Sequence, residues 1–71
     1  MNIKMLKCLV GLADKKVDVV NTDDFFKNFP KTNSNLRDLY ALKNLGYVSI
    51  LGSDDDIDAI GVNQSAIGYF N

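Results

Sequence analysis

The chain has 71 residues, the size of one small domain, and we expect residues 1–71 to fold as a single unit. Hydrophobic residues make up 46% of it, which excludes a disordered chain, and no apolar run approaches the ~20 residues that a membrane-spanning helix requires. With one cysteine, Cys8, and no histidine, the sequence excludes an internal disulfide and offers no zinc site. The missing histidine also removes the commonest general base, so we expect neither a metal or other cofactor nor enzyme activity.

The first residues lack the pattern of a secretory signal. Lysines are scattered among the apolar side chains of residues 1–7, whereas a signal peptide separates its basic region from its apolar region. We therefore expect a cytoplasmic protein that does not contact a membrane.

Charge is distributed unevenly along the chain. The net charge of −1 argues against binding to nucleic acid by bulk electrostatics alone. Residues 1–37 nevertheless hold seven basic and four acidic side chains, whereas residues 38–71 hold one lysine and five aspartates. The first half is therefore basic and the second half acidic.

Residues 3–13 are predicted to form the first helix, because apolar side chains recur at helical spacing from Ile3 to Val10. Apolar side chains cover a second side of this helix as well, and we expect the thiol of Cys8 to be buried there and inert. A helix that is apolar on two sides is either packed in the middle of a domain or shared with a partner chain.

A short strand and a short second helix are predicted next. Apolar and acidic residues alternate over residues 17–19, which favours a very short strand. Thr22 is then a good N-cap for a helix, because two aspartates follow it in the first turn. Three phenylalanines give this helix a large ring area to bury, and Pro30 ends it.

The third helix is predicted over residues 33–45, and Gly46 supplies its C-terminal stop. Either Thr32 or Ser34 is its N-cap. Leucines and a tyrosine line the inner side of this helix. Its outer side carries amide, hydroxyl and guanidinium groups, which can hydrogen-bond to base edges and phosphates.

The remaining residues predict a hairpin and a last helical turn. Residues 47–51 and 57–62 have the composition of strands, and a turn at residues 52–56 joins them into an antiparallel pair. Residues 63–65 can cap a short helical turn over residues 66–70. So short a helix must dock on the body of the domain or on a neighbouring chain.

This order of elements resembles that of a winged helix-turn-helix domain, an α+β fold with three helices, a short strand and a two-stranded hairpin. The sequence Leu-Lys-Asn-Leu-Gly-Tyr-Val at residues 42–48 looks like the junction of recognition helix and wing in many bacterial and phage regulators. Residues 59–70 are similar to the last segment of small winged-helix proteins from low-GC Gram-positive bacteria and their phages. Residues 63–66 stand where those proteins have a threonine-led turn.

The resemblance implies a small transcriptional regulator that binds double-stranded DNA. In that family the third helix enters the major groove, and the wing touches an adjacent backbone or minor groove. Carried over to this chain, the candidates that face bases are Asn33, Ser34, Asn35 and Arg37. The candidates that face phosphates are Lys31, Thr32, Lys43 and Asn44.

The hairpin tip, residues 53–58, carries Asp54, Asp55, Asp56 and Asp58, which would repel phosphates. Three interpretations stay open: the tip points away from DNA, contacts a basic protein partner, or is a solvated turn that protects the hairpin edge. Its spacing lacks the central glycine and final glutamate of a calcium loop. The alternative function is a protein-interaction module that uses this acidic tip and does not bind DNA.

A homodimer is the other partner that we expect. The apolar excess of the predicted helix over residues 3–13 would supply one part of the contact, and Tyr69 and Phe70 would supply the other.

Overall fold

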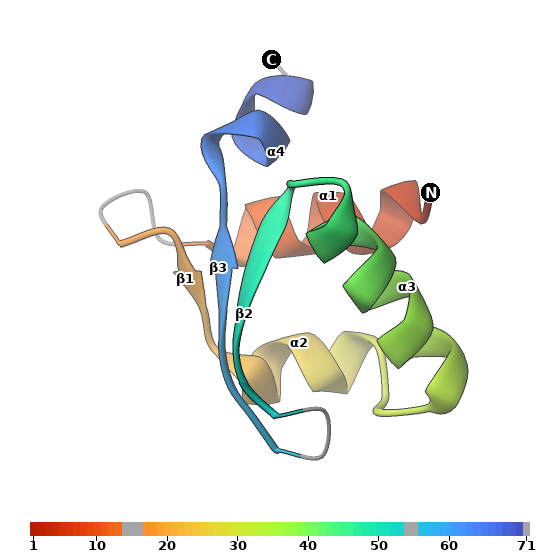
Figure 1. Cartoon of the computed structure of the whole chain (residues 1–71). Helices are drawn as coiled ribbons and strands as arrows, with labels where there is room; N and C mark the ends of the chain where they lie inside the picture. The colour runs from red at the N-terminus through yellow and green to blue at the C-terminus, as the bar shows by residue number, and fades with distance from the viewer. Residues whose placement is uncertain (14–16, 54–55, 71) are drawn as a thin grey trace.

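The computed structural model describes residues 1–13, 17–53 and 56–70. Within them the chain has four helices and a three-stranded antiparallel sheet, so the predicted α+β class is confirmed (Figure 1). The elements in chain order are α1 (Ile3–Leu12), β1 (Val19–Val20), α2 (Thr22–Asn28), α3 (Asn33–Asn44), β2 (Val48–Ser53), β3 (Asp56–Val62) and α4 (Gln64–Tyr69). None of the helices in these residues is both long and apolar enough to cross a membrane.

The sheet has the strand order β1-β3-β2, so the predicted hairpin is confirmed and β1 joins it at the far edge of β3. Val20 pairs with Ile60, and Ile60 pairs on its other side with Ile50. The strand predicted over residues 17–19 is displaced toward the C-terminus. Asp18 has a φ of 54°, so the chain turns there and only Val19 and Val20 pair with β3.

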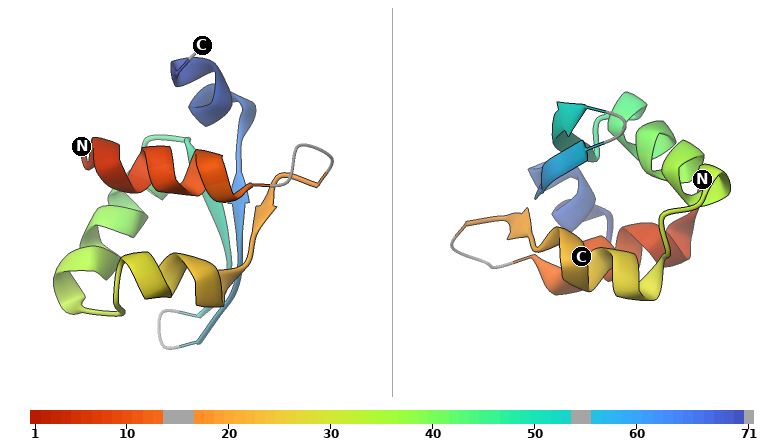
Figure 2. Two further views of the ribbon diagram at one scale, coloured as in Figure 1. Left: turned by 180° about the vertical axis from the view of Figure 1, so that it is seen from behind. Right: turned by 90° about the horizontal axis from the view of Figure 1, so that it is seen from below.

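The core lies between one face of the sheet and the helices. Helices α1 and α2 cross this face side by side, and α3 flanks them (Figures 1 and 2). The fully buried large side chains come from every layer of this arrangement: Met5, Leu6, Leu9, Val20, Phe25, Leu39, Leu42, Val48 and Ile60. Because α1 contacts α2, α3 and α4, its apolar surface is largely used inside the domain. Cys8 is half-buried, and burial raises the pKa of its thiol.

Side-chain caps fix where the two central helices begin. The N-cap of α2 is Asn21, whose Oδ1 accepts hydrogen bonds from the backbone N–H groups of Asp23 and Asp24 at 2.9 and 3.3 Å. The prediction of Thr22 as this cap is therefore wrong by one residue. For α3, Thr32 is the N-cap, and its Oγ1 accepts from the backbone N–H of Asn35 at 3.2 Å.

Gly46 ends α3, as predicted, and directs the chain into β2. Its φ of 86° lies in the left-handed region, which glycine enters without the steric cost of a Cβ. The Gly46 N–H donates to the carbonyl of Lys43 at 2.9 Å, and the Tyr47 N–H donates to that of Leu42 at 3.0 Å. These two bonds form a Schellman motif, which satisfies the last carbonyls of the helix.

The C-terminal helix α4 begins at Gln64, two residues before the predicted helical turn, and it docks on the end of α3. The Asn63 Nδ2 and the Ser65 Oγ both donate to the carbonyl oxygen of Gly46, at 2.9 and 2.8 Å. The rings of Tyr47 and Tyr69 meet edge to face with centroids 5.8 Å apart. Of the two alternatives that the sequence leaves open, the structure shows docking on the body of the domain.

Candidate nucleic-acid interface

The outer side of α3 is a continuous exposed stripe. Leu39 and Leu42 are fully buried on the opposite side and fix the rotation of the helix. We define the α3 stripe as the exposed residues of that outer side, which are Asn33, Ser34, Arg37, Ala41 and Asn44. All but Ala41 were predicted. Ala41 completes the stripe because it follows Arg37 by one helical turn, a spacing that could have identified it from the sequence.

The guanidinium of Arg37 is the cation of the stripe. In the part of the chain that the structure describes, this guanidinium makes no hydrogen bond or ion pair. The adjacent acid, Asp38, is half-buried, and its Oδ2 accepts a hydrogen bond from the Asn2 Nδ2 at 3.0 Å. Since Asn2 caps α1, the carboxylate of Asp38 faces the start of that helix, and the positive charge of Arg37 is left available.

Two predicted contact residues hold the turn that precedes the stripe. The Nδ2 of Asn35 donates to the carbonyl of Pro30 at 2.7 Å, and Thr32 caps the helix through its hydroxyl. Asn35 is half-buried. Both side chains therefore position the first turn of α3, Asn35 through its Nδ2 and Thr32 through its Oγ1.

Lysines lie at the two ends of the stripe. The Nζ of Lys31 lies 5.7 Å from the centroid of the Phe26 ring, and the Nζ of Lys43 lies 5.5 Å from that of Tyr40. Both distances are in the range of cation–π attraction. Both lysines are exposed, so each ammonium group lies over its ring at the surface of the protein.

The hairpin has the opposite charge. Asp56 and Asp58 are exposed on β3, whereas Asp54 and Asp55 of the predicted acidic tip lie outside the described residues. The register of the hairpin shifts between Leu51 and Gly52, where the φ of Gly52 is 107°. This shift is a bulge in the strand pair, which increases the local twist near the acidic end of the hairpin.

Comparison with known proteins assigns this chain to no family. A scan against protein-family models found no match, and searches of the curated proteins and of the solved structures found none either. Among the described residues, no three side chains of the cysteine, aspartate or glutamate type gather as a metal site would require. Function has to be inferred from the geometry and charge of the α3 stripe and its surroundings.

Proposed function

We propose that this protein is a winged helix-turn-helix protein that binds double-stranded DNA through the α3 stripe and acts as a small cytoplasmic transcriptional regulator without enzyme activity. One observation carries the proposal. The exposed side of α3 presents amides, a hydroxyl and a guanidinium that has no acidic partner in the described residues, between two lysines. These are the groups that hydrogen-bond to base edges and phosphates.

The arrangement of the elements supports the fold that this proposal needs. Residues 29–32 join α2 to α3 by a short turn, as in a helix-turn-helix pair. Helix α3 then leads through Gly46 into the β2–β3 hairpin, which in this proposal serves as the wing. β1 pairs with β3 and ties the hairpin to the body of the domain.

The α3 stripe suits the major groove. The Arg37 guanidinium can donate two hydrogen bonds to the O6 and N7 atoms of guanine, and the amide of Asn33 can pair with adenine. The methyl group of Ala41 suits contact with a thymine methyl group. Lys31 and Lys43 lie at the two ends of the helix, where a helix in the groove would meet the flanking phosphates.

In this proposal the acidic end of the hairpin stays out of the DNA. Carboxylates such as those of Asp56 and Asp58 would raise the free energy of binding if they lay against phosphates. Affinity would then depend on α3 alone, which favours two copies acting on two half-sites.

The predicted homodimer contact stays a prediction, and it has a smaller apolar surface to use than the sequence indicates. Four exposed large apolar side chains lie in or next to α1 and α4: Met1, Ile3, Tyr69 and Phe70. Tyr69 also packs its ring against Phe70, with centroids 5.0 Å apart. Sedimentation velocity over a range of protein concentrations measures the oligomeric state.

Fluorescence anisotropy with labelled duplex DNA of random sequence, at low salt, tests DNA binding. We expect saturable binding, and we expect Arg37→Ala to raise the Kd severalfold, because it removes a cation that faces the DNA backbone as well as the bases. Lys7→Ala is the control, because it removes the same charge from the exposed side of α1. Absence of binding at tens of micromolar protein, or equal Kd values for wild type and Arg37→Ala, would refute the proposal.

A second candidate function is a protein-interaction module that uses the hairpin. It is favoured by Leu51, which is 65% exposed on the strand beside the acidic residues Asp56 and Asp58. A pull-down with wild type and an Asp56→Ser/Asp58→Ser variant tests it. A partner recovered by wild type and lost with the variant, together with no binding to DNA, would favour this function over the first.

A further inference from the structure

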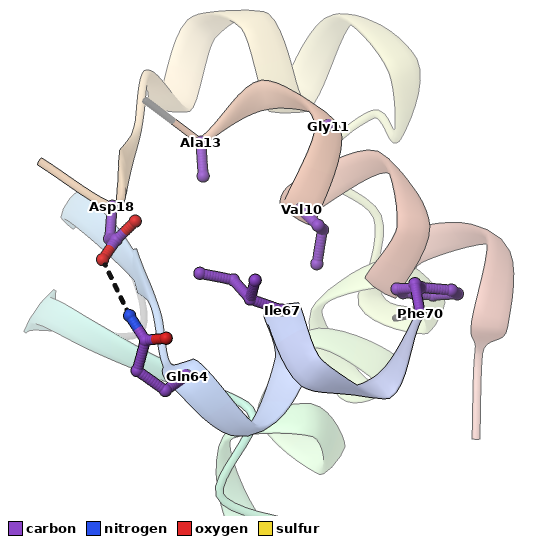
Figure 3. A pocket seen from close by; sticks show the side chains of 7 residues that line it. All are labelled: Val10, Gly11, Ala13, Asp18, Gln64, Ile67 and Phe70. Atoms are coloured by element: carbon purple, nitrogen blue, oxygen red, sulfur yellow. Dashed lines mark hydrogen bonds between the residues drawn. The ribbon is translucent and has the colours of Figure 1, made fainter. Parts of the chain in front are cut away.

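A groove lies where the end of α1 meets α4, on a different part of the surface from the α3 stripe. The groove is partly open to solvent and has a volume of about 550 Å³, a size suited to a small organic ligand. Val10 and Ala13 of the α1 end, together with Ile67 and Phe70 of the α4 end, supply its apolar side chains, and Gly11 lines it as well (Figure 3). The groove is separate from the α3 stripe, since none of its lining residues belongs to α3.

One end of the groove is polar. Asp18 and Gln64 meet there, and the Gln64 Nε2 donates to the Asp18 Oδ2 at 3.4 Å (Figure 3). This is a long hydrogen bond, and a carboxylate accepts several. Its oxygens therefore retain capacity to accept hydrogen bonds from a ligand.

The backbone holds Asp18 in this position. Its carbonyl accepts a hydrogen bond from the Val62 N–H at 2.8 Å, and its φ of 54° is a conformation that few residues other than glycine, asparagine and aspartate adopt. The carboxylate is thus presented from a constrained turn beside the apolar wall. Positive φ at a non-glycine residue is a feature that recurs at ligand sites.

We propose that this groove binds a small amphiphilic cation, meaning a primary ammonium group on a compact apolar body. The carboxylate of Asp18 would accept hydrogen bonds from the ammonium group, and the apolar wall would bury the body of the ligand. An anionic ligand would be repelled by Asp18. A wholly apolar ligand would leave the carboxylate desolvated without a new partner. The proposal does not depend on DNA binding.

Binding is tested by titrating the ¹⁵N-labelled protein with 2-phenylethylammonium and, as the matched neutral probe, 2-phenylethanol. We expect saturable changes in the amide resonances of Val10, Ile67 and Phe70, with about threefold tighter binding of the cation, the worth of a solvent-exposed ion pair. Asp18→Asn keeps the shape of the side chain and its tolerance of positive φ. We expect this variant to bind both probes equally.

A second variant tests the location. Gly11 lines the groove, and a Cβ at this position would have no heavy atom within 4 Å, so we expect the side chain of Gly11→Leu to narrow the groove. We expect Gly11→Leu to weaken the binding of both probes severalfold, while amide resonances away from the groove stay unchanged. The proposal is overturned by absence of saturable changes at ~10 mM probe, by equal binding of the two probes to wild type, or by an undiminished cation preference in Asp18→Asn. Changes at the groove on raising protein concentration alone would assign it to a second copy of the chain.

Discussion

Helix α3 and the β2–β3 hairpin follow one another along the chain and meet at Gly46, yet their outer surfaces differ in charge. The α3 stripe carries Arg37 and is flanked by two lysines, whereas the described part of the hairpin exposes Asp56 and Asp58 and no basic side chain. Both elements bury apolar side chains in the same core. Two elements that adjoin in the fold can therefore suit different partners. The exposed charges of α3 favour a polyanion such as DNA, whereas those of the hairpin disfavour it.

The largest difference that we expect concerns how each element is anchored. Leu39→Ala should lower the free energy of unfolding by about 2–5 kcal/mol, because it removes a fully buried side chain on the inner side of α3. Leu51→Ala, on the exposed side of the hairpin, should change it by less than about 0.5 kcal/mol. Urea denaturation measures both. Similar losses of unfolding free energy in the two variants would mean that the outer surface of the hairpin contributes as much to stability as the inner side of α3.

Glycine substitutions compare the turn after α3 with the bulge in the hairpin. Gly52→Ala should cost about 2–3 kcal/mol, since its Cβ would lie 2.8 Å from the backbone nitrogen of Asp58 and its φ is positive. Gly46→Ala should cost about 1 kcal/mol, because it has a positive φ but open space around it. Thermal unfolding of the two variants measures the difference, and a larger loss for Gly46→Ala would contradict the steric argument.

A smaller effect is expected where α4 docks on the end of α3. Ser65→Ala removes the hydrogen bond from its hydroxyl to the Gly46 carbonyl and should cost about 0.5–1 kcal/mol. Ser34→Ala is the matched control on the α3 stripe, where the hydroxyl makes no hydrogen bond in the described residues, and it should leave stability within about 0.5 kcal/mol. Equal stability of the two variants in urea would mean that the Ser65 bond contributes nothing.

The smallest effect concerns the acidic hairpin. Asp58→Asn should strengthen DNA binding about twofold at low salt, because it removes an exposed carboxylate from the element next to α3, and the gain should vanish as salt is raised. Asp18→Asn, remote from α3, makes the same charge change and should leave the Kd unchanged. Anisotropy titrations at two salt concentrations measure both. A twofold gain from Asp18→Asn as well would attribute the effect to net charge alone.

Local patterns in the sequence predicted the longer elements well. Periodic apolar residues identified α1 and α3, and Gly46 identified the junction with β2, because helix packing and a left-handed stop depend on residues within a few positions. The predicted N-cap of α2 was Thr22, whereas the observed N-cap is Asn21. Asparagine and threonine are both good N-cap residues, so residue preference alone does not choose between these two neighbours. The displaced β1 has a different cause: its register is set by pairing with Gly61 and Ile60, far away in the sequence.

The candidate site was predicted less completely. The sequence identified Arg37 and Asn33 through their outward positions on α3. It did not reveal that Asn35 reaches back to the Pro30 carbonyl, because such a hydrogen bond depends on the three-dimensional turn. Nor did it reveal the groove that contains Asp18, since its walls come from segments about fifty residues apart that meet only after folding.

The carbonyl oxygen of Gly46 receives side-chain hydrogen bonds from residues 17 and 19 positions further along the chain. During synthesis, α3 is therefore made well before the residues that secure its C-terminal end. The C-terminal end of α3 is secured only once residues 63–65 have also been made. A domain of this size folds as one cooperative unit, so the helix that carries the proposed DNA-binding surface and the C-terminal segment that holds its end become stable together.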